Sequence, residues 1–148
     1  MFRMNVITAP DAAALASRMR IAVMRLSRKL RREGSGANIT PTLLAALSTI
    51  ERHGRMTAGE LATHEQVQKP TVTRILADLL ERGLVTRTAD PLDGRIAWVQ
   101  ISAEGQRLLQ SIRRRHDAYL AARLKRLTPE ELTVLESAAE ILERLTDR

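Results

Sequence analysis

The chain has 148 residues, enough to bury a substantial core, and we expect a single domain over residues 1–148. It contains no cysteine, which excludes disulfides, zinc–thiolate sites and thiol redox sensing. The sequence has neither an apolar run of membrane-spanning length nor a signal-peptide pattern. We therefore expect a cytoplasmic protein without a membrane partner.

The formal net charge of +7 is concentrated near the N-terminus. Seven basic residues and no acidic residue occur between positions 18 and 32: Arg18, Arg20, Arg25, Arg28, Lys29, Arg31 and Arg32. The other 17 basic residues equal the 17 acidic ones, and positions 40–100 carry seven of each. Net charge therefore does not by itself predict nucleic-acid binding. The basic segment is either a solvated helix face or a surface near phosphates or an acidic ligand.

The first two predicted helices are bounded by clear start and stop signals. The first covers residues 11–32, ends at Gly34-Ser35-Gly36, and carries an apolar stripe: Leu15, Met19, Ala22, Val23, Leu26 and Leu30. The second begins with Thr40 as N-cap and Pro41 at its first position, and ends at Gly54. Its core-facing residues are expected to be Leu44, Leu47 and Ile50. His53 reads as a polar helix-end residue, with a ligand role as the alternative.

A helix–turn–helix is predicted next. Thr57 and Glu60 form a capping box that begins a short helix over residues 58–64. A second helix has Pro70 in its first turn and ends at Gly83. Its apolar residues fall on one face at helical spacing: Val72, Ile75, Leu76, Leu79 and Leu80.

Two β-rich runs at 85–89 and 96–101 follow, joined by the turn-forming sequence DPLDGR. A helix–turn–helix followed by a hairpin predicts a mainly α (α+β) fold. It consists of a winged helix–turn–helix core over about residues 40–101, with a two-stranded wing. This order of elements points to double-stranded DNA as a partner.

Two more helices complete the predicted fold. Ser102 caps a helix that runs to about Arg126, on which His116 reads as a satisfied, partly buried histidine. Thr128-Pro129-Glu130-Glu131 is a capping box, and the helix after it repeats apolar residues at heptad-like spacing: Leu132, Leu135, Ala139, Leu142 and Leu145. The stripes at about 11–33 and 102–148 lie outside the winged core, so we expect these helices to form a homodimer.

The polar side of the second helix of the motif is the expected DNA-reading surface, because its apolar side must pack on the core. Arg74 suits a guanine edge or a phosphate, and Arg95 in the wing suits a narrow minor groove, with Asp93 orienting it through an ion pair. Asp78 and Glu81 would repel phosphates, which limits contact to the first two turns. The candidate DNA-binding residues are Thr57, Gln68, Lys69, Pro70, Thr71, Thr73, Arg74, Asp93 and Arg95.

The whole chain resembles the MarR family of bacterial winged-helix regulators. The matching pieces are ELATHEQVQKPTVTRILADLLERGLV and DPLDGR, followed by the strand ending in Ile101-Ser102. The resemblance implies a homodimer on a pseudo-palindromic operator, a repressor of a nearby gene, and release of DNA by a small aromatic or phenolic acid. Two departures concern the turn and the cap: Gln68 stands where many members have serine, and no glycine occupies the turn at Glu65 and Gln66.

Two other classes of function are alternatives to a DNA-binding regulator. The neutral charge of positions 40–100 leaves open a winged module that binds a ligand or a protein instead of DNA. An enzyme is disfavoured, because the sequence contains no metal-ligand cluster, phosphate loop or triad spacing, and no cofactor or metal is predicted. For the aromatic acid, the expected crevice is lined by Arg20, Met24, Ile50 and His53.

Overall fold

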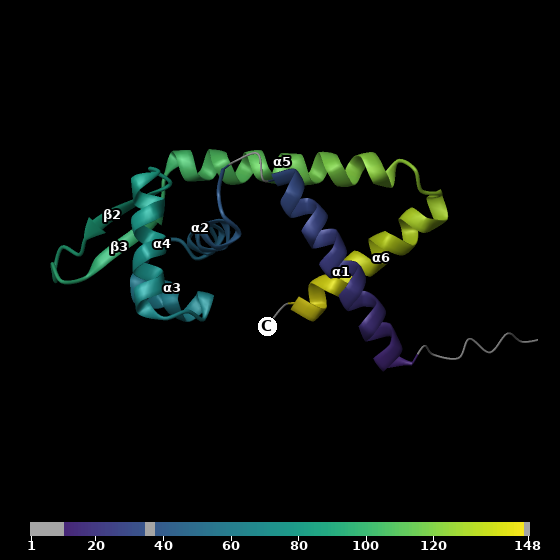
Figure 1. The fold of residues 1–148 in the computed structure, drawn as a ribbon, viewed down its shortest axis with the longest axis horizontal. Coiled ribbons are helices and arrows are strands. Elements are labelled where there is room, and N and C mark those ends of the chain that lie inside the picture. The colour runs from purple at the N-terminus through teal and green to yellow at the C-terminus, as the bar shows by residue number, and fades with distance from the viewer. Residues whose placement is uncertain (1–10, 35–37, 147–148) are drawn as a thin grey trace, which may run out of the picture.

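The computed structural model describes residues 11–34 and 38–146. Its helices and strands, in chain order, are α1 (Ala12–Gly34), α2 (Pro41–His53), β1 (Met56–Thr57), α3 (Ala58–Glu65), α4 (Lys69–Glu81), β2 (Val85–Ala89), β3 (Ala97–Ile101), α5 (Ala103–Leu124) and α6 (Pro129–Thr146). Figure 1 shows α5 as a long bar with α2, α3, α4 and the hairpin at one end. The helix α1 packs on α5, and α6 turns back from its far end.

The predicted two-stranded wing is present, and one further strand, β1, extends it to a three-stranded sheet. Its order is β1-β3-β2, with both pairs antiparallel. The pair β2–β3 aligns Val85 with Ile101 and Ala89 with Ala97, which forms the predicted hairpin. The extra strand β1 aligns Met56 with Val99. Two residues show no periodicity along the sequence, so only their pairing with β3 reveals them.

A single core joins the three helices of the motif, the sheet and α5. Its buried side chains are Leu43, Ala46, Leu47, Ile50, Met56, Leu61, Val72, Ile75, Leu76, Leu79, Leu84, Val85, Val99 and Leu109. Leu47 and Ile50 occupy the predicted positions, while Leu44 is only partly buried and Leu43 lies deeper. The predicted apolar face of α4 is confirmed, with Leu80 at its edge.

The predicted helix caps are present. Thr40 Oγ1 accepts the N–H of Leu43 at 3.3 Å, and Thr57 forms the complete capping box with Glu60. Ser102 Oγ accepts the N–H of Gly105 at 3.0 Å and donates to the carbonyl oxygen of Gly83 at 2.6 Å. This second bond fixes the start of α5 against the end of α4. The Thr128 capping box closes through Glu131, whose carboxylate accepts the Thr128 N–H at 2.9 Å.

Gly34 belongs to α1, which corrects the expectation that this glycine breaks the helix; Ser35 and Gly36 lie outside the described residues. A Cβ at Gly34 would meet the Nε2 atom of His116 at 2.7 Å and the Ile112 side chain at 3.3 Å. The glycine therefore permits a close approach of α1 to α5. Within the described part of the chain, the buried Nε2 atom of His116 has no hydrogen-bond partner. The expectation of a satisfied histidine is wrong, because glycine and isoleucine offer it no side-chain donor or acceptor.

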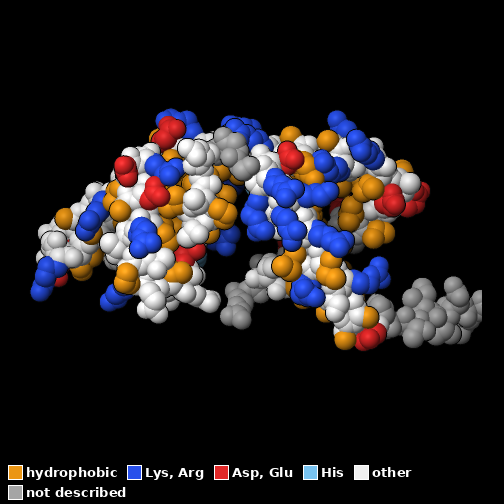
Figure 2. Space-filling model, in the orientation of Figure 1, with side chains coloured by type: hydrophobic (Ala, Val, Ile, Leu, Met, Phe, Trp, Pro, Cys, Tyr) orange, Lys and Arg blue, Asp and Glu red, His pale blue; other side chains and the backbone are white. Residues whose placement is uncertain are grey.

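The terminal helices differ from the core in their burial. The helix α6 has no buried residue, and α1 buries only Gly34. Large apolar side chains are exposed along both: Leu15, Ile21, Val23, Met24 and Leu26 on α1, and Leu132, Val134, Leu135, Ile141, Leu142 and Leu145 on α6. Figure 2 shows many lysine and arginine side chains gathered over α1 and the adjoining part of α5.

Candidate nucleic-acid interface

The helix α4 separates its apolar and polar residues as the sequence predicts. Val72, Ile75, Leu76 and Leu79 are buried, while the opposite face is exposed: Lys69, Pro70, Thr71, Thr73, Arg74 and Ala77. Gln68 is the N-cap in an extended conformation but makes no side-chain cap bond, as its replacement of serine suggested. The helix therefore presents a polar face about two turns long, beginning at its positively polarised N-terminus.

Two of the candidate threonines use their hydroxyl protons inside the chain. Thr73 Oγ1 donates to the carbonyl oxygen of Lys69 at 3.0 Å. Thr57 Oγ1 donates to the Glu60 carboxylate at 2.9 Å and accepts the Glu60 N–H at 3.3 Å. Since phosphate oxygens accept hydrogen bonds, each hydroxyl would have to give up its internal bond to contact a phosphate. The position of Thr57 is that of a helix cap, and its DNA contact stays a prediction.

Asp78 is paired with a base, which reduces its expected repulsion of phosphates. Its Oδ1 atom accepts the Nε–H of Arg82 at 2.5 Å, and Arg82 also donates from Nη1 to the carbonyl oxygen of Asn38 at 2.8 Å. This arginine therefore ties the end of α4 to the segment before α2. The carboxylate of Asp78 lies one turn beyond the polar face of α4, and Arg82 compensates its charge.

The turn between α3 and α4 adopts a left-handed conformation without glycine. Gln66 has φ 53° and ψ 42°, and its N–H is directed at the carbonyl oxygens of Ala62 and Thr63. A side chain in this region costs about 1–2 kcal/mol. The hydrogen bonds of the turn, including the 3.1 Å bond from Val67 N to Ala62 O, hold the strained residue in place.

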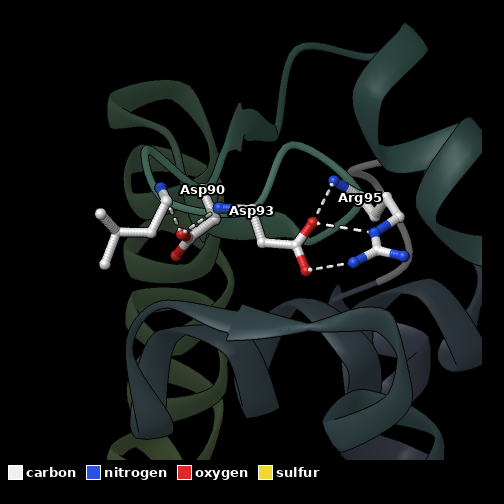
Figure 3. A network of polar contacts seen from close by, with 4 residues as sticks. Asp90, Asp93 and Arg95 are labelled. Atoms are coloured by element: carbon white, nitrogen blue, oxygen red, sulfur yellow. Dashed lines mark hydrogen bonds and ion pairs between the residues drawn. The ribbon is translucent and has the colours of Figure 1, made fainter.

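The wing presents Arg95 to solvent (Figure 3). Asp93 Oδ1 accepts the Arg95 backbone N–H at 3.0 Å and its Nε–H at 3.1 Å, which confirms the predicted ion pair. The hydrogen bonds from Arg95 hold the pKa of the Asp93 carboxyl below its usual value. The Arg95 side chain is 93% exposed, and its recorded side-chain bonds within the described residues go to Asp93.

Three residues that the sequence did not single out support this wing. Asp90 Oδ1 accepts the N–H groups of Leu92 at 2.8 Å and Asp93 at 3.1 Å, and its Oδ2 accepts the Nε1–H of Trp98 at 2.7 Å. These hydrogen bonds lower the pKa of Asp90, and the bond from Trp98 has the largest effect. The guanidinium of Arg55 lies 4.4 Å from the centre of the Trp98 ring. Only the Asp90-Pro91 turn signal pointed to this cluster, because the rest of it joins distant segments.

A small hollow of about 210 Å³ lies between α4 and the sheet. Apolar side chains of Leu76, Leu80 and Val99 line it, together with Thr73 and Arg87. Arg87 is exposed on β2 and was not among the predicted site residues. The hollow shares Thr73 with the polar face of α4.

The expected aromatic-acid crevice does not form as predicted. Ile50 is 0% exposed inside the core, so it cannot line a crevice. Arg20 and Met24 are exposed on α1. The ring of His53, at the end of α2, stacks on that of His64 with centroids 4.1 Å apart.

An amphipathic α4 beside a wing with an exposed arginine defines a winged helix–turn–helix DNA-binding protein. Among the residues described, no helix has the length and hydropathy needed to cross a bilayer, and no group of three or more His, Cys, Asp or Glu could hold a metal ion.

Comparisons with known proteins agree with this class. The model of the MarR family matches residues 39–97. An HTH-type transcriptional regulator of Mycobacterium tuberculosis is 41% identical, covering 91% of this chain and 94% of the relative. The HTH-type transcriptional repressor MdtR of Bacillus subtilis is 30% identical, covering 64% of this chain and 61% of MdtR.

Solved structures show the same fold. A putative transcriptional regulator from Pseudomonas aeruginosa has a TM-score of 0.82 at 32% identity, covering 92% of this chain and 96% of that one. A mutant of MepR from Staphylococcus aureus, solved bound to an oligodeoxyribonucleotide, has a TM-score of 0.72 at 20% identity, covering 89% and 98% of the two chains. This chain belongs to the MarR family of transcriptional regulators, which are not enzymes.

Proposed function

We propose that this protein is a homodimeric repressor that binds a pseudo-palindromic operator. The observation that carries the proposal is the polar face of α4 beside the exposed Arg95, with the apolar face of α4 buried. In this arrangement α4 enters the major groove and the wing reaches the adjacent minor groove. The MepR structure, solved with a bound oligodeoxyribonucleotide, supports the same use of the fold.

Arg74 is assigned the principal base or phosphate contact, because it is exposed on the first two turns of α4 and offers paired donors. Gln68, Lys69 and Thr71 lie at the N-terminal end of α4, where side chains reach base edges and phosphates. Arg95 is assigned to the flanking minor groove, whose negative potential is enhanced over A·T-rich sequence.

A homodimer is supported by the apolar side chains exposed along α1 and α6. A helix with a continuous apolar stripe and no buried residue is typical of an interface that a second chain completes. Two copies would place their α4 helices in successive major grooves, about 34–36 Å apart.

The similarity to MdtR, named a repressor, supports the assignment of repression. The test is selection of fragments of the source genome with the purified protein, followed by sequencing. We expect an inverted repeat with half-sites one DNA turn apart, upstream of a gene whose transcription rises when the protein is removed. Recovery of no enriched sequence would refute the proposal. A fall in transcription of the gene when the protein is removed would refute the claim of repression.

The proposal includes an aromatic acid that releases DNA. Its binding site is assigned to a different place from the predicted crevice. The hollow between α4 and the sheet has apolar walls, and Arg87 offers a partner for a carboxylate. Single-ring aromatic carboxylates should release labelled operator from the wild-type protein and do so less effectively with Arg87→Ala. A panel of such acids that leaves the complex intact would exclude this effector class.

A further inference from the structure

The outer face of the sheet brings Arg55 to the wing. Side chains alternate between the two faces of a strand, and Trp98 pairs with Thr57 on β1 and Thr88 on β2. Val99, the next residue, is buried in the core, so Trp98 lies on the opposite face. Arg55 precedes β1 by one residue and has the same parity as Thr57, which places its guanidinium over the Trp98 ring.

A continuous series of contacts runs from Arg55 to the tip of the wing. The guanidinium of Arg55 covers the indole of Trp98, and the indole Nε1–H donates to Asp90 at 2.7 Å. Asp90 in turn accepts the backbone N–H of Asp93 at 3.1 Å. The Asp93 carboxylate then accepts both the backbone and side-chain N–H of Arg95. These contacts connect Arg55 to Arg95, although the two residues are 40 positions apart in the sequence.

The base of the wing pairs with β1 and packs on the core, whereas the tip beyond Ala89 and Ala97 is held by its turn and by this series. The tip is well exposed, with Leu92 98% and Ile96 38% accessible, and two-stranded hairpins are marginally stable alone. One oxygen of Asp90 accepts N–H groups of the turn and the other accepts from Trp98 on β3, so the orientation of this carboxylate fixes the turn that carries Asp93 and Arg95.

We propose that Arg55 is a positioning residue for minor-groove recognition: through Trp98 and Asp90 it fixes the wing, and thereby sets where Arg95 meets DNA. The proposal rests on the DNA-binding function proposed above. It assigns to Arg55 no base contact of its own, and it makes the preference for flanking A·T sequence depend on a residue outside the wing.

The test compares three variants with the wild-type protein. Arg55→Ala removes the cation above Trp98, and Arg55→Lys keeps a cation with weaker stacking. Arg52→Ala is the matched control, because Arg52 is an exposed arginine three positions earlier, at the end of α2. Unfolding curves for all variants establish that each is folded before binding is measured.

Fluorescence of the free protein tests the contact independently of DNA, because Trp98 is the only tryptophan in the sequence. Arg55→Ala should shift the emission of Trp98 and raise its quenching by acrylamide, with Arg55→Lys in between and Arg52→Ala like the wild type. Unchanged emission and quenching in Arg55→Ala would overturn the proposal, even if the protein bound no DNA at all.

Binding to operators with A·T or G·C flanks tests the consequence for recognition. Arg55→Ala should weaken binding to the A·T-flanked operator about fivefold, bring the two operators closer in affinity, and cause little further loss in an Arg95→Ala background. A direct phosphate contact by Arg55 would instead weaken both operators equally, lower the salt slope by about one, and add to the effect of Arg95→Ala. That result would overturn the positioning role. If the wild-type protein selects no operator, the proposed function fails and only the fluorescence result stands.

Discussion

The winged core and the terminal helices use apolar residues in opposite ways. In the core, Leu47, Ile50 and Leu79 are 0% exposed and packed by their own chain. On α6, Leu145 is 69% and Val134 is 67% exposed, and no residue is buried. Exposed apolar surface of this extent favours association with a second chain, whereas the apolar residues of the core are already covered by their own chain. The difference separates the region whose apolar side chains are covered within one chain from the region that we attribute to dimerisation.

The largest expected effect is on the core. Leu47→Ala should lower the free energy of unfolding by about 3–5 kcal/mol, because it removes a fully buried side chain and leaves a cavity. Urea unfolding at fixed protein concentration measures the change. Leu145→Ala is the control, since its side chain is mostly exposed in one chain. An equal loss for both variants at low protein concentration would contradict the distinction between the two regions.

The second prediction concerns the apolar surface of α6. Leu135 lies between two shallow apolar grooves, one bounded by Leu127 and Val134 and the other by Leu124 and Leu132. Leu135→Glu should raise the dissociation constant of the dimer by about a hundredfold or more, because a carboxylate would be buried there. Sedimentation equilibrium measures it, with Glu136→Gln, which removes a charge beside it, as the control. A wild-type protein that stays monomeric at high concentration would remove the dimer from the proposal.

The third prediction concerns the surface that the core presents to DNA. Arg74→Ala should weaken operator binding by about 1–3 kcal/mol, and Arg95→Ala should weaken it less, through the minor groove. Titrations at several salt concentrations should show a steep loss of affinity with salt, because bound phosphates release counterions. Arg107→Ala serves as the control, because Arg107 lies on α5 and forms an ion pair with Glu104 at 2.6 Å. Wild-type affinity in both Arg74→Ala and Arg95→Ala at matched salt would refute the docking arrangement.

The smallest expected effect lies where the two regions join. Arg113 on α5 donates to Glu51 on α2, and this hydrogen bond is the main reason that the pKa of Glu51 is lowered. A carboxyl whose pKa is lower in the folded state stabilises that state above its unfolded pKa, near 4.5, and the contribution is lost as pH falls through the folded value. The Arg113 side chain is 54% exposed, so the pair should contribute at most about 1 kcal/mol.

Comparison of the wild-type protein with Arg113→Ala at two pH values measures this contribution. The variant should be slightly less stable in urea at pH 7, and the difference should shrink as the pH falls through the lowered pKa of Glu51, because the carboxyl then becomes protonated. Persistence of the full difference in acid would indicate that Arg113 acts through packing of its aliphatic part and not through its charge.

The elements of the winged core follow closely from local sequence signals. Capping boxes at Thr57 and Thr128 and the N-cap serines and threonines predict where helices begin, because the bonds they make lie within one turn. The spacing of Val72, Ile75 and Leu79 predicts which face of α4 is buried and therefore which face is available to DNA. Asp93 and Arg95 are two positions apart, so their ion pair was also predictable.

Features that depend on distant segments were not predictable in this way. The two-residue strand β1 exists through its pairing with β3, about 40 positions later. The series from Arg55 through Trp98 to Asp90 crosses three segments, and the turn signal at Asp90 gives no indication of its contact with Trp98 or of the contact between Trp98 and Arg55. The close approach of Gly34 to His116 likewise depends on how α1 packs on α5, and it overturned the reading of both residues.

By itself, the sequence determined the class of fold, the starts of the capped helices and the polar face of α4, because backbone capping and helical periodicity act over a few residues. The tertiary structure decided which apolar faces are covered within the chain and which stay exposed on α1 and α6. It also decided how Arg95 is held, since the support of the wing comes from Arg55 across the sheet. Contacts between residues far apart in sequence form only when the whole chain has folded, so they leave no local pattern to read.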